Sequence, residues 1–481
     1  MGPVGKAALV FLRLATPIVF AMHFWGIWRP SVWEDEVATI GGANRSLASL
    51  WELVHRVDLV HGTYYLLVHF WGQVFGFSPV SIRTISALAI TASFVFVYLT
   101  ARLLGSARFA RYSSMIFAFL PAITWGSTEA RSYALAVLVA TLLTYLFVRN
   151  LESGRWWLYF VVAAVGVYLF MYLILVVAAH GLVLVALRKP IRRVLGFLVG
   201  GLALMLTSLP LTLGAMSQSH QVSWITMPKP WLVPTDALVM PYFLYSLWPP
   251  IVAFVVLLAG WLVSRKSREP VGPLLTSLIL SMLLAPPAAL LLLSLVTQPV
   301  YVPRYVMFGA GAMAMLLGLA VERMPRRWLR VTAMGLILVA AAPSYLEYRA
   351  PDGKLTDWRQ SAEIMADQAK PGDAVLFSDD QARATISRSV FAYPELFSGV
   401  SDLTLIPESK TPRLLQRHSL QPSMVSKLGS YQRVWLLNDT SIPAQQATVA
   451  RMSRELSAAG FRLAETKTLR FSSVLLFEKR R

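Results

Sequence analysis

The sequence AALVFLRLATPIVFAMHFWGIW at residues 7–28 is followed by RPSVWEDEVATIGG at residues 29–42. The first stretch is apolar and long enough to cross a bilayer as a helix. Because it ends in bulky aromatic residues, it lacks the small-residue cleavage site of a signal peptide, and we expect it to be retained. The second stretch places three consecutive acids, Glu34, Asp35 and Glu36, directly after this expected helix.

The composition is that of a membrane protein. Of 481 residues, 56% are hydrophobic and 14% are charged, whereas soluble domains carry about 25% charged residues. We therefore predict an α-helical polytopic membrane protein with about eleven transmembrane helices. The expected spans are residues 7–28, 80–104, 110–126, 131–149, 155–171, 172–188, 194–216, 245–264, 272–296, 305–322 and 328–345.

The distribution of charge indicates the topology. Lys and Arg gather in every second loop, which places the N-terminus in the cytoplasm, and an odd number of helices then places the C-terminal region outside. The net charge of +19 therefore indicates contact with the bilayer, and we expect no nucleic acid partner. The chain has no cysteine, which excludes disulfides and thiolate metal sites. The aromatic-rich segment 59–77 is expected to be an interfacial helix.

The last part of the chain differs in character. Residues 346–481 hold roughly half of the charged residues, and short apolar runs at 374–377, 403–406, 433–437 and 473–477 alternate with amphipathic stretches at 356–370 and 444–460. This alternation predicts a small extracytoplasmic α/β domain. The expected division is thus a transmembrane module at 1–345, which includes an outer loop at 29–79, and an α/β domain at 346–481. A lid or acceptor-docking role and a stabilising role are both open for this domain.

The acids and histidines of the first outer loop are candidates for chemistry. Asp35 has apolar residues close to it in the sequence, at Trp33, Val37 and Ile40. The following stretch HRVDLVHGTYYLLVH carries His55, Asp58 and His61 at a spacing that would share one face of a helix. Carboxylates and imidazoles near the membrane surface can move protons and orient hydroxyl groups. A solvated loop and a bound divalent cation are the alternatives, because these side chains also suit a metal.

Two arginines lie in loops that otherwise hold few basic residues. Arg131 belongs to TEARSYAL at 128–135, and Arg304 belongs to TQPVYVPRYVMF at 297–308. They could extend to lipid headgroups. The functional interpretation is a phosphate clamp, because a guanidinium group matches phosphate geometry. A third outer patch, SQSHQVSWITMPKPW at 217–231, is rich in aromatic residues.

These motifs, in this order, resemble integral membrane glycosyltransferases of the C-type (GT-C) fold. The resemblance is to the bacterial protein mannosyltransferase and lipid A aminoarabinose transferase group. It rests on the pair Asp35-Glu36, on D-x-x-H-G-x-Y-Y at 58–65, on EARSYAL at 129–135 and on P-R-Y at 303–305, and it covers most of residues 25–320. The His61-Gly62 pair departs from the proline-containing segment of many relatives. The C-terminal α/β domain resembles the tails of bacterial members, which makes protein O-mannosylation less favoured.

The resemblance implies an inverting transfer of a sugar from a polyprenyl-phosphate donor to a cell-envelope glycan or glycolipid acceptor. The sugar is expected to be mannose or arabinofuranose, and the location to be the outer face of a bacterial cytoplasmic (inner) membrane. Asp35 would be the general base, and Arg131 and Arg304 would stabilise the leaving phosphate.

The predicted site residues fall into three groups. The catalytic carboxylates are Asp35 and Glu36. The residues expected to bind the donor or acceptor sugar are His55, Asp58, His61, Tyr64, Glu129 and Trp224. The residues expected to bind the phosphate are Arg131, Arg304 and Tyr305. No resident metal or cofactor is assigned, and a divalent cation is left as an alternative. The alternative functions are a transporter or flippase of a lipid-linked glycan, and a non-catalytic partner in glycan assembly.

Overall fold

The computed structural model describes residues 5–265, 271–379, 385–406, 414, 417–418, 427–443 and 445–480. The chain forms two compact units. The helical unit comprises Met1–Ile27, Val54–Tyr64 and Arg83–Tyr348, and the sheet unit comprises Trp28–Leu53, Tyr65–Ile82 and Arg349–Arg481. The predicted outer loop 29–79 therefore contributes residues to both units.

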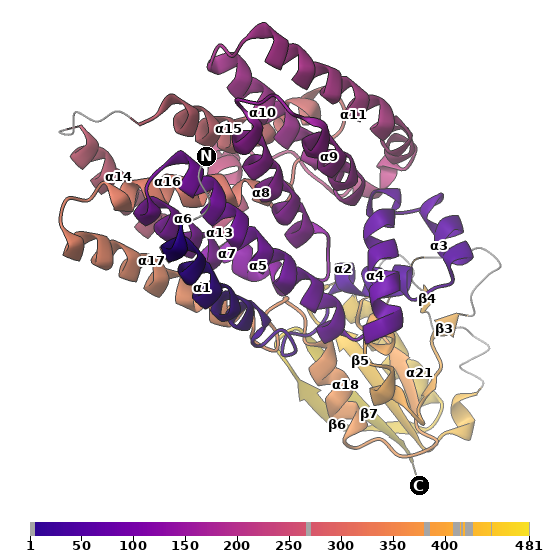
Figure 1. The fold of residues 1–481 in the computed structure, drawn as a ribbon. Coiled ribbons are helices and arrows are strands. Elements are labelled where there is room, and N and C mark those ends of the chain that lie inside the picture. Colours follow the sequence, from indigo (N-terminus) through magenta and orange to yellow (C-terminus); the bar gives the residue numbers. More distant parts are fainter. Residues whose placement is uncertain are drawn as a thin grey trace. The chain divides into compact units, whose positions relative to one another are not determined.

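The helical unit is built from long apolar helices joined by short connections (Figure 1). Its helices are α1 (Lys6–Phe24), α5 (Pro79–Leu104, which begins in the sheet unit), α6 (Ala107–Phe119), α7 (Pro121–Gly126), α8 (Tyr133–Asn150), α9 (Trp157–Leu169), α10 (Ile174–Ala186), α11 (Ile191–Ser217), α12 (Val233–Leu238), α13 (Met240–Phe243), α14 (Trp248–Ser264), α15 (Pro273–Val296), α16 (Ala310–Glu322) and α17 (Arg327–Glu347). Short 3₁₀ turns η1 to η5 lie at Leu59–His61, Met171–Leu173, Ser219–Val222, Pro230–Leu232 and Pro303–Gly309.

Helices occur at the eleven expected spans, but their lengths differ. In the described part of the chain, seven helical stretches are long and apolar enough to cross a membrane: α1, α5, α8, α11, α15, η5 with α16, and α17. Helices α9, α10 and α14 are apolar but shorter. The expected span 110–126 is divided between α6 and α7, because Pro121 lacks an N–H group and Leu120 before it adopts an extended conformation. The protein is thus a multi-pass membrane protein, and the number eleven stays a prediction.

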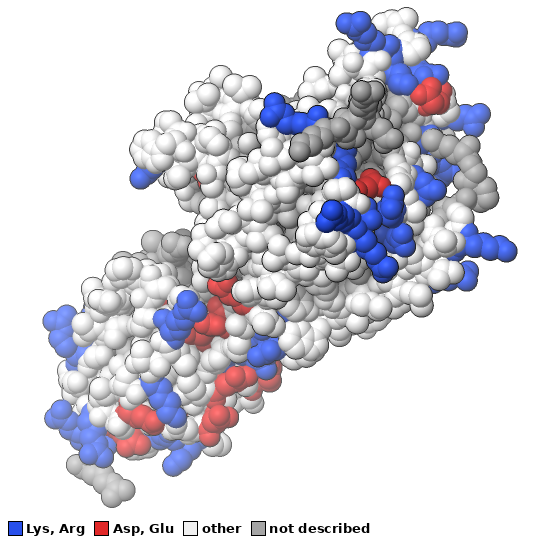
Figure 2. All heavy atoms as spheres, turned by 90° about the vertical axis from the view of Figure 1, so that its left-hand side faces the viewer, with Lys and Arg blue, Asp and Glu red and all other residues white. Residues whose placement is uncertain are grey.

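The outer surface of the helices is apolar. Figure 2 shows a broad surface without charged side chains over the helices, with Lys and Arg gathered at its margins. Along α11, large side chains such as Leu198, Leu202, Leu206 and Leu213 are exposed. In water such a stripe would be costly, whereas in a bilayer it contacts lipid chains.

The segment expected to be interfacial consists of η1 and the helix α4 (Gly62–Phe75). With 14 residues, α4 is shorter than the roughly 20 residues that a span needs. Leu66, Phe70 and Val74 are exposed on it, and their spacing of four residues places them on one face. This face suits an amphipathic helix at a membrane surface, although its depth in a bilayer stays a prediction.

The sheet unit contains a five-stranded sheet in the order β2-β1-β5-β7-β6. Strand β1 (Ala374–Phe377) runs parallel to β2 (Ser401–Asp402) and β5 (Arg433–Asp439), while β7 (Ser472–Lys479) is antiparallel to β5 and to β6 (Phe461–Thr468). Strands β3 (Leu405–Ile406) and β4 (Arg417–His418) form a separate pair. The other elements are α2 (Glu34–Ala43), α3 (Leu47–Val54), α18 (Trp358–Ala366), α19 (Ser389–Ala392), α21 (Gln445–Ala458), η6 (Ile386–Arg388), η7 (Pro394–Phe397) and η8 (Leu428–Ser430).

Helices cover both faces of this sheet, as the alternation of strand side chains requires. Leu376 and Leu436 join Met452 and Leu456 of α21 in one buried core. On the other face, Ser472 of β7 hydrogen-bonds α18 through Ser361. The predicted α/β fold is therefore confirmed as a sheet between helices, and its strands β1, β5 and β7 match three of the expected apolar runs. Its extracytoplasmic location stays a prediction.

Candidate functional site

The guanidinium group of Arg304 is held among aromatic rings in the helical unit. Arg304 lies in η5, and its Nε donates a hydrogen bond to the hydroxyl of Tyr133, the first residue of α8, at 3.0 Å. Its Cζ lies 5.7 Å from the ring centroid of Trp224 and 5.9 Å from that of Tyr305. These distances are within the range of cation–π attraction. Three of the predicted site residues, Trp224, Arg304 and Tyr305, are thus brought together.

More aromatic residues pack against the rings beside this arginine. The ring of Tyr305 stacks on Tyr172 at 5.3 Å and lies 6.5 Å from that of Tyr133. Phe170 meets Tyr133 and Tyr305 edge-on. The rings beside Arg304 thus belong to a larger aromatic cluster, and the attraction of a guanidinium group for an anion is stronger where water is scarce. The aromatic residues Tyr133, Phe170 and Tyr172 were not predicted as site residues.

The second predicted arginine lies close to the same helix end. Arg131 occupies the turn between α7 and α8, is 6% exposed, and its Nη2 is 2.8 Å from Nε2 of His61. Since arginine has no acceptor atom, it is the donor, and the His61 Nε2 atom must be unprotonated in this arrangement. The structure therefore joins His61 to Arg131, two residues that lie far apart in the sequence.

Both arginines lie beside the beginning of α8. Arg131 precedes Tyr133, the first residue of α8, by two positions, and Arg304 of η5 donates to the Tyr133 hydroxyl. The N-terminus of a helix carries a partial positive charge from its unpaired N–H groups. Two guanidinium groups beside this end make a place that favours a phosphate. Glu129 precedes Arg131 and is fully buried, and its carbonyl oxygen accepts a hydrogen bond from Ser86 at 2.5 Å. That bond fixes the backbone of the turn.

The predicted shared helical face of His55, Asp58 and His61 is wrong. Helix α3 ends at Val54, and Asp58 has φ = 58°, which breaks the helix before η1. His55 is exposed, whereas Asp58 and His61 are half-buried. The reason is that the bend is stabilised from elsewhere in the helical unit.

Two glutamines hold that bend. The side chain of Gln221 accepts from the Asp58 N–H at 3.1 Å, and that of Gln218 accepts from Leu59 N–H at 3.0 Å and donates to the Val54 carbonyl at 2.9 Å. Both belong to the polar run SQSHQV, which was noted only as part of an aromatic patch. Tyr64, in the first turn of α4, is fully buried. Among the described residues, no three His, Asp or Glu side chains form a group that could hold a metal ion.

The predicted catalytic carboxylates lie in the first turn of α2, in the sheet unit. All three acids, Glu34, Asp35 and Glu36, are in this turn, where the helix dipole stabilises negative charge. Glu34 forms an ion pair with Arg388 at 2.7 Å. Glu36 is fully buried and Asp35 is half-buried, so the three neighbouring carboxylates have three different environments.

Comparison with known proteins decides the fold. A family model described as dolichyl-phosphate-mannose-protein mannosyltransferase matches residues 63–212. The crystal structure of ArnT from Cupriavidus metallidurans bound to undecaprenyl phosphate is similar, with 13% identity, 98% of both chains covered and a TM-score of 0.58. The chain has the C-type glycosyltransferase fold.

The predicted C-type fold is thereby confirmed. The apo structure of the same ArnT gives 12% identity over 98% of both chains and a TM-score of 0.56. The arabinofuranosyltransferase AftD from Mycobacteria is 16% identical over 98% of this chain and 41% of its own, with a TM-score of 0.49. The comparison with curated proteins gives no match.

Proposed function

We propose that this chain is an inverting glycosyltransferase that moves a sugar from a polyprenyl-phosphate donor to a cell-envelope glycan or glycolipid. The observation that carries the proposal is the pair of arginines at the beginning of α8, with Arg304 oriented by Tyr133 and Arg131 by His61. The structurally similar ArnT was crystallised with undecaprenyl phosphate, which has the same anionic group on a lipid chain. Mannose and arabinofuranose are the proposed sugars.

The proposed reaction breaks one bond and forms one bond. An acceptor hydroxyl oxygen attacks the anomeric carbon as the bond from that carbon to the phosphate oxygen breaks, and the bonding electrons pass to the phosphate. Asp35 takes the hydroxyl proton as general base. The leaving phosphate gains negative charge, and fixed guanidinium groups stabilise that charge more in the transition state than in the bound donor. The second carboxylate of the pair, Glu36, is fully buried, and we propose a supporting role for it.

The remaining predicted residues have proposed roles in binding. Trp224 is 57% exposed and lies beside Arg304, so its ring can stack against a sugar near the phosphate. His61 both orients Arg131 and presents an imidazole near the same place. Glu129, Asp58, His55 and Tyr64 stay proposed sugar-binding residues, and Glu129 and Tyr64 are fully buried.

The test compares transfer by Arg304→Ala and Arg149→Ala in nanodiscs. Arg149 is a matched control, because its Nη1 donates to the Tyr145 hydroxyl at 3.3 Å near the opposite end of α8. The donors are synthetic polyprenyl-phosphate mannose and arabinofuranose, the acceptor is an envelope lipid extract, and the readout is labelled sugar in product. We expect transfer by wild type and Arg149→Ala and loss in Arg304→Ala. Movement of intact donor between leaflets without transfer would instead identify a flippase and refute the proposal.

A further inference from the structure

We propose that Arg388 is a positioning residue for the reaction, which holds the first turn of α2 and so sets the place of Asp35. This inference rests on the proposed function, because it assigns Asp35 the role of base. It goes beyond that function in giving the C-terminal α/β domain a task in catalysis. All the contacts that carry it lie within the sheet unit.

The segment that leads into α2 is bound along its whole length by the C-terminal part of the sheet unit. The Ser31 N–H donates to the Pro351 carbonyl at 2.8 Å, and the Ser31 hydroxyl accepts from the Arg359 N–H at 3.1 Å. The Arg359 Nη1 atom also donates to the Trp28 carbonyl at 2.8 Å. Two of these three bonds use backbone atoms of the segment, and the third uses the Ser31 hydroxyl.

The next residue, Val32, is held from two sides. Its N–H donates to the Tyr393 hydroxyl at 3.0 Å, and its carbonyl accepts from the Thr356 hydroxyl at 2.7 Å. Val32 itself is fully buried. The chain then enters α2 through Trp33, and the Glu34 carboxylate meets Arg388. The ion pair is therefore made by the residue directly before Asp35.

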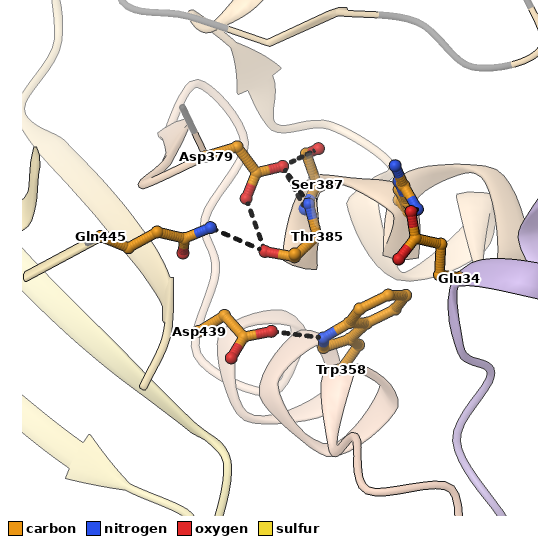
Figure 3. A network of polar contacts seen from close by, with 8 residues as sticks. Glu34, Trp358, Asp379, Thr385, Ser387, Asp439 and Gln445 are labelled. Carbon is orange, nitrogen blue, oxygen red and sulfur yellow. Dashed lines mark hydrogen bonds and ion pairs between the residues drawn. The ribbon is translucent and has the colours of Figure 1, made fainter. Parts of the chain in front are cut away.

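The turn that leads to Arg388 is held by a network of polar side chains around Asp379 (Figure 3). Asp379 follows strand β1 and accepts hydrogen bonds from the backbone N–H groups of Thr385 and Ser387, at 2.9 and 3.2 Å, and from both of their hydroxyl groups. Gln445 at the beginning of α21 donates to the Thr385 hydroxyl at 3.0 Å. Since Arg388 follows Ser387 directly, its backbone is tied to the end of a central strand.

The burial of the two partners differs in a way that favours a positioning role. The side chain of Arg388 is 9% exposed and that of Glu34 is 42% exposed. A buried guanidinium group requires a partner, because an unpaired buried charge is costly. The side chain of Glu34 is thereby directed toward Arg388 in η6, and the helical rotation of about 100° per residue directs Asp35 elsewhere. Of the three acids, Glu34 is thus assigned to structure and Asp35 to chemistry.

Loss of this anchor should lower turnover and leave donor binding unchanged. The phosphate is proposed to bind at Arg131 and Arg304, in the helical unit, and Arg388 is in the sheet unit. A displacement of a catalytic group by about 1 Å can cost about 100-fold in rate. We expect Arg388→Met to lower kcat by about 10-fold to 100-fold with the KM for the donor within about 2-fold, and Arg388→Lys to restore much of kcat.

The experiment measures kcat and KM for polyprenyl-phosphate sugar with Arg388→Met, Arg388→Lys, Glu34→Gln and the double variant of Arg388→Met with Glu34→Gln. The matched control is Arg433→Met, because Arg433 is 12% exposed in the same unit and pairs with Asp373 at 3.6 Å. Thermal unfolding reports any general loss of stability. Hydrogen exchange of residues 34–43 supplies a readout that does not depend on activity.

If the proposal is right, Arg388→Met and Glu34→Gln lower kcat by similar factors, and the double variant has no lower kcat than either single variant. Hydrogen exchange of residues 34–43 is then faster in Arg388→Met than in Arg433→Met. Equal kcat in Arg388→Met and Arg433→Met would overturn it, as would a change confined to KM. If the wild type transfers no sugar, the proposed function fails, and unchanged exchange in 34–43 would separately overturn the anchor.

Discussion

Removal of one hydroxyl group, in Tyr133→Phe, tests whether the orientation of Arg304 matters for transfer. The change keeps the ring that packs against Phe170 and Tyr305 and deletes only the acceptor of the 3.0 Å bond from the Arg304 Nε atom. Because Arg304 is half-buried, we take the lower end of the range for a hydrogen bond to a charged group, about 1.5 kcal/mol. That corresponds to about a 10-fold loss of kcat/KM.

The full contribution of the guanidinium group is larger. Removing one group that stabilises transition-state charge costs about 2.7–4 kcal/mol, which lowers the rate by about 100-fold to 1,000-fold. The kcat/KM of Arg304→Ala should therefore be lower than that of Tyr133→Phe. The assay is steady-state transfer in nanodiscs, and the matched control is Tyr145→Phe, whose hydroxyl accepts from Arg149 at 3.3 Å. We expect the control to stay within about 2-fold of wild type. Equal losses in the two tyrosine variants would refute the reasoning.

Three other perturbations address separate steps. Asp35→Asn keeps the size of the side chain and removes the base, so transfer should fall by about 100-fold or more with unchanged thermal unfolding; near-normal transfer would exclude Asp35 as the base. His61→Ala removes the partner of Arg131, and the KM for the donor should rise by about 10-fold; an unchanged KM would contradict the role of the pair. Burial raises the pKa of Asp357 above 3.8, so its contribution to stability is full below that pH and declines as pH rises through the raised pKa. Thermal unfolding measured from about pH 3.5 upward should show the unfolding temperature of the wild type falling relative to that of Asp357→Asn as pH rises, and a constant difference would refute this sign.

Local patterns carry the parts of the fold that could be predicted. Apolar length located the helices, and the runs AVLF, RVWLL and SVLLF became β1, β5 and β7, because buried central strands are apolar throughout. Strand β6 was missed since only Phe461 is buried along it, which leaves an edge strand without apolar alternation. Pro121 indicated the division of the expected helix 110–126. The pattern alone did not show whether this proline or the long apolar run around it would decide the structure.

The contacts that build the site are of another kind. The bond from Arg304 to Tyr133 spans 171 positions in the sequence, and the Gln221 bond to Asp58 spans 163. Such pairings follow from the packing of whole helices, and no local period reports them. The same holds for Glu34 and Arg388. The motif resemblance named Arg304 and Asp58 as candidates, whereas their partners Tyr133 and Gln221 are evident only from the structure.

The most direct test of the central claim is a cryo-EM map of the protein in nanodiscs with a polyprenyl phosphate. The account predicts phosphate density within hydrogen-bonding reach of Arg304 or Arg131, at the beginning of α8, in the wild type and its loss in Arg304→Ala. Phosphate density at Arg149, at the other end of the same helix, or in a passage between the helices away from both arginines, would contradict the account.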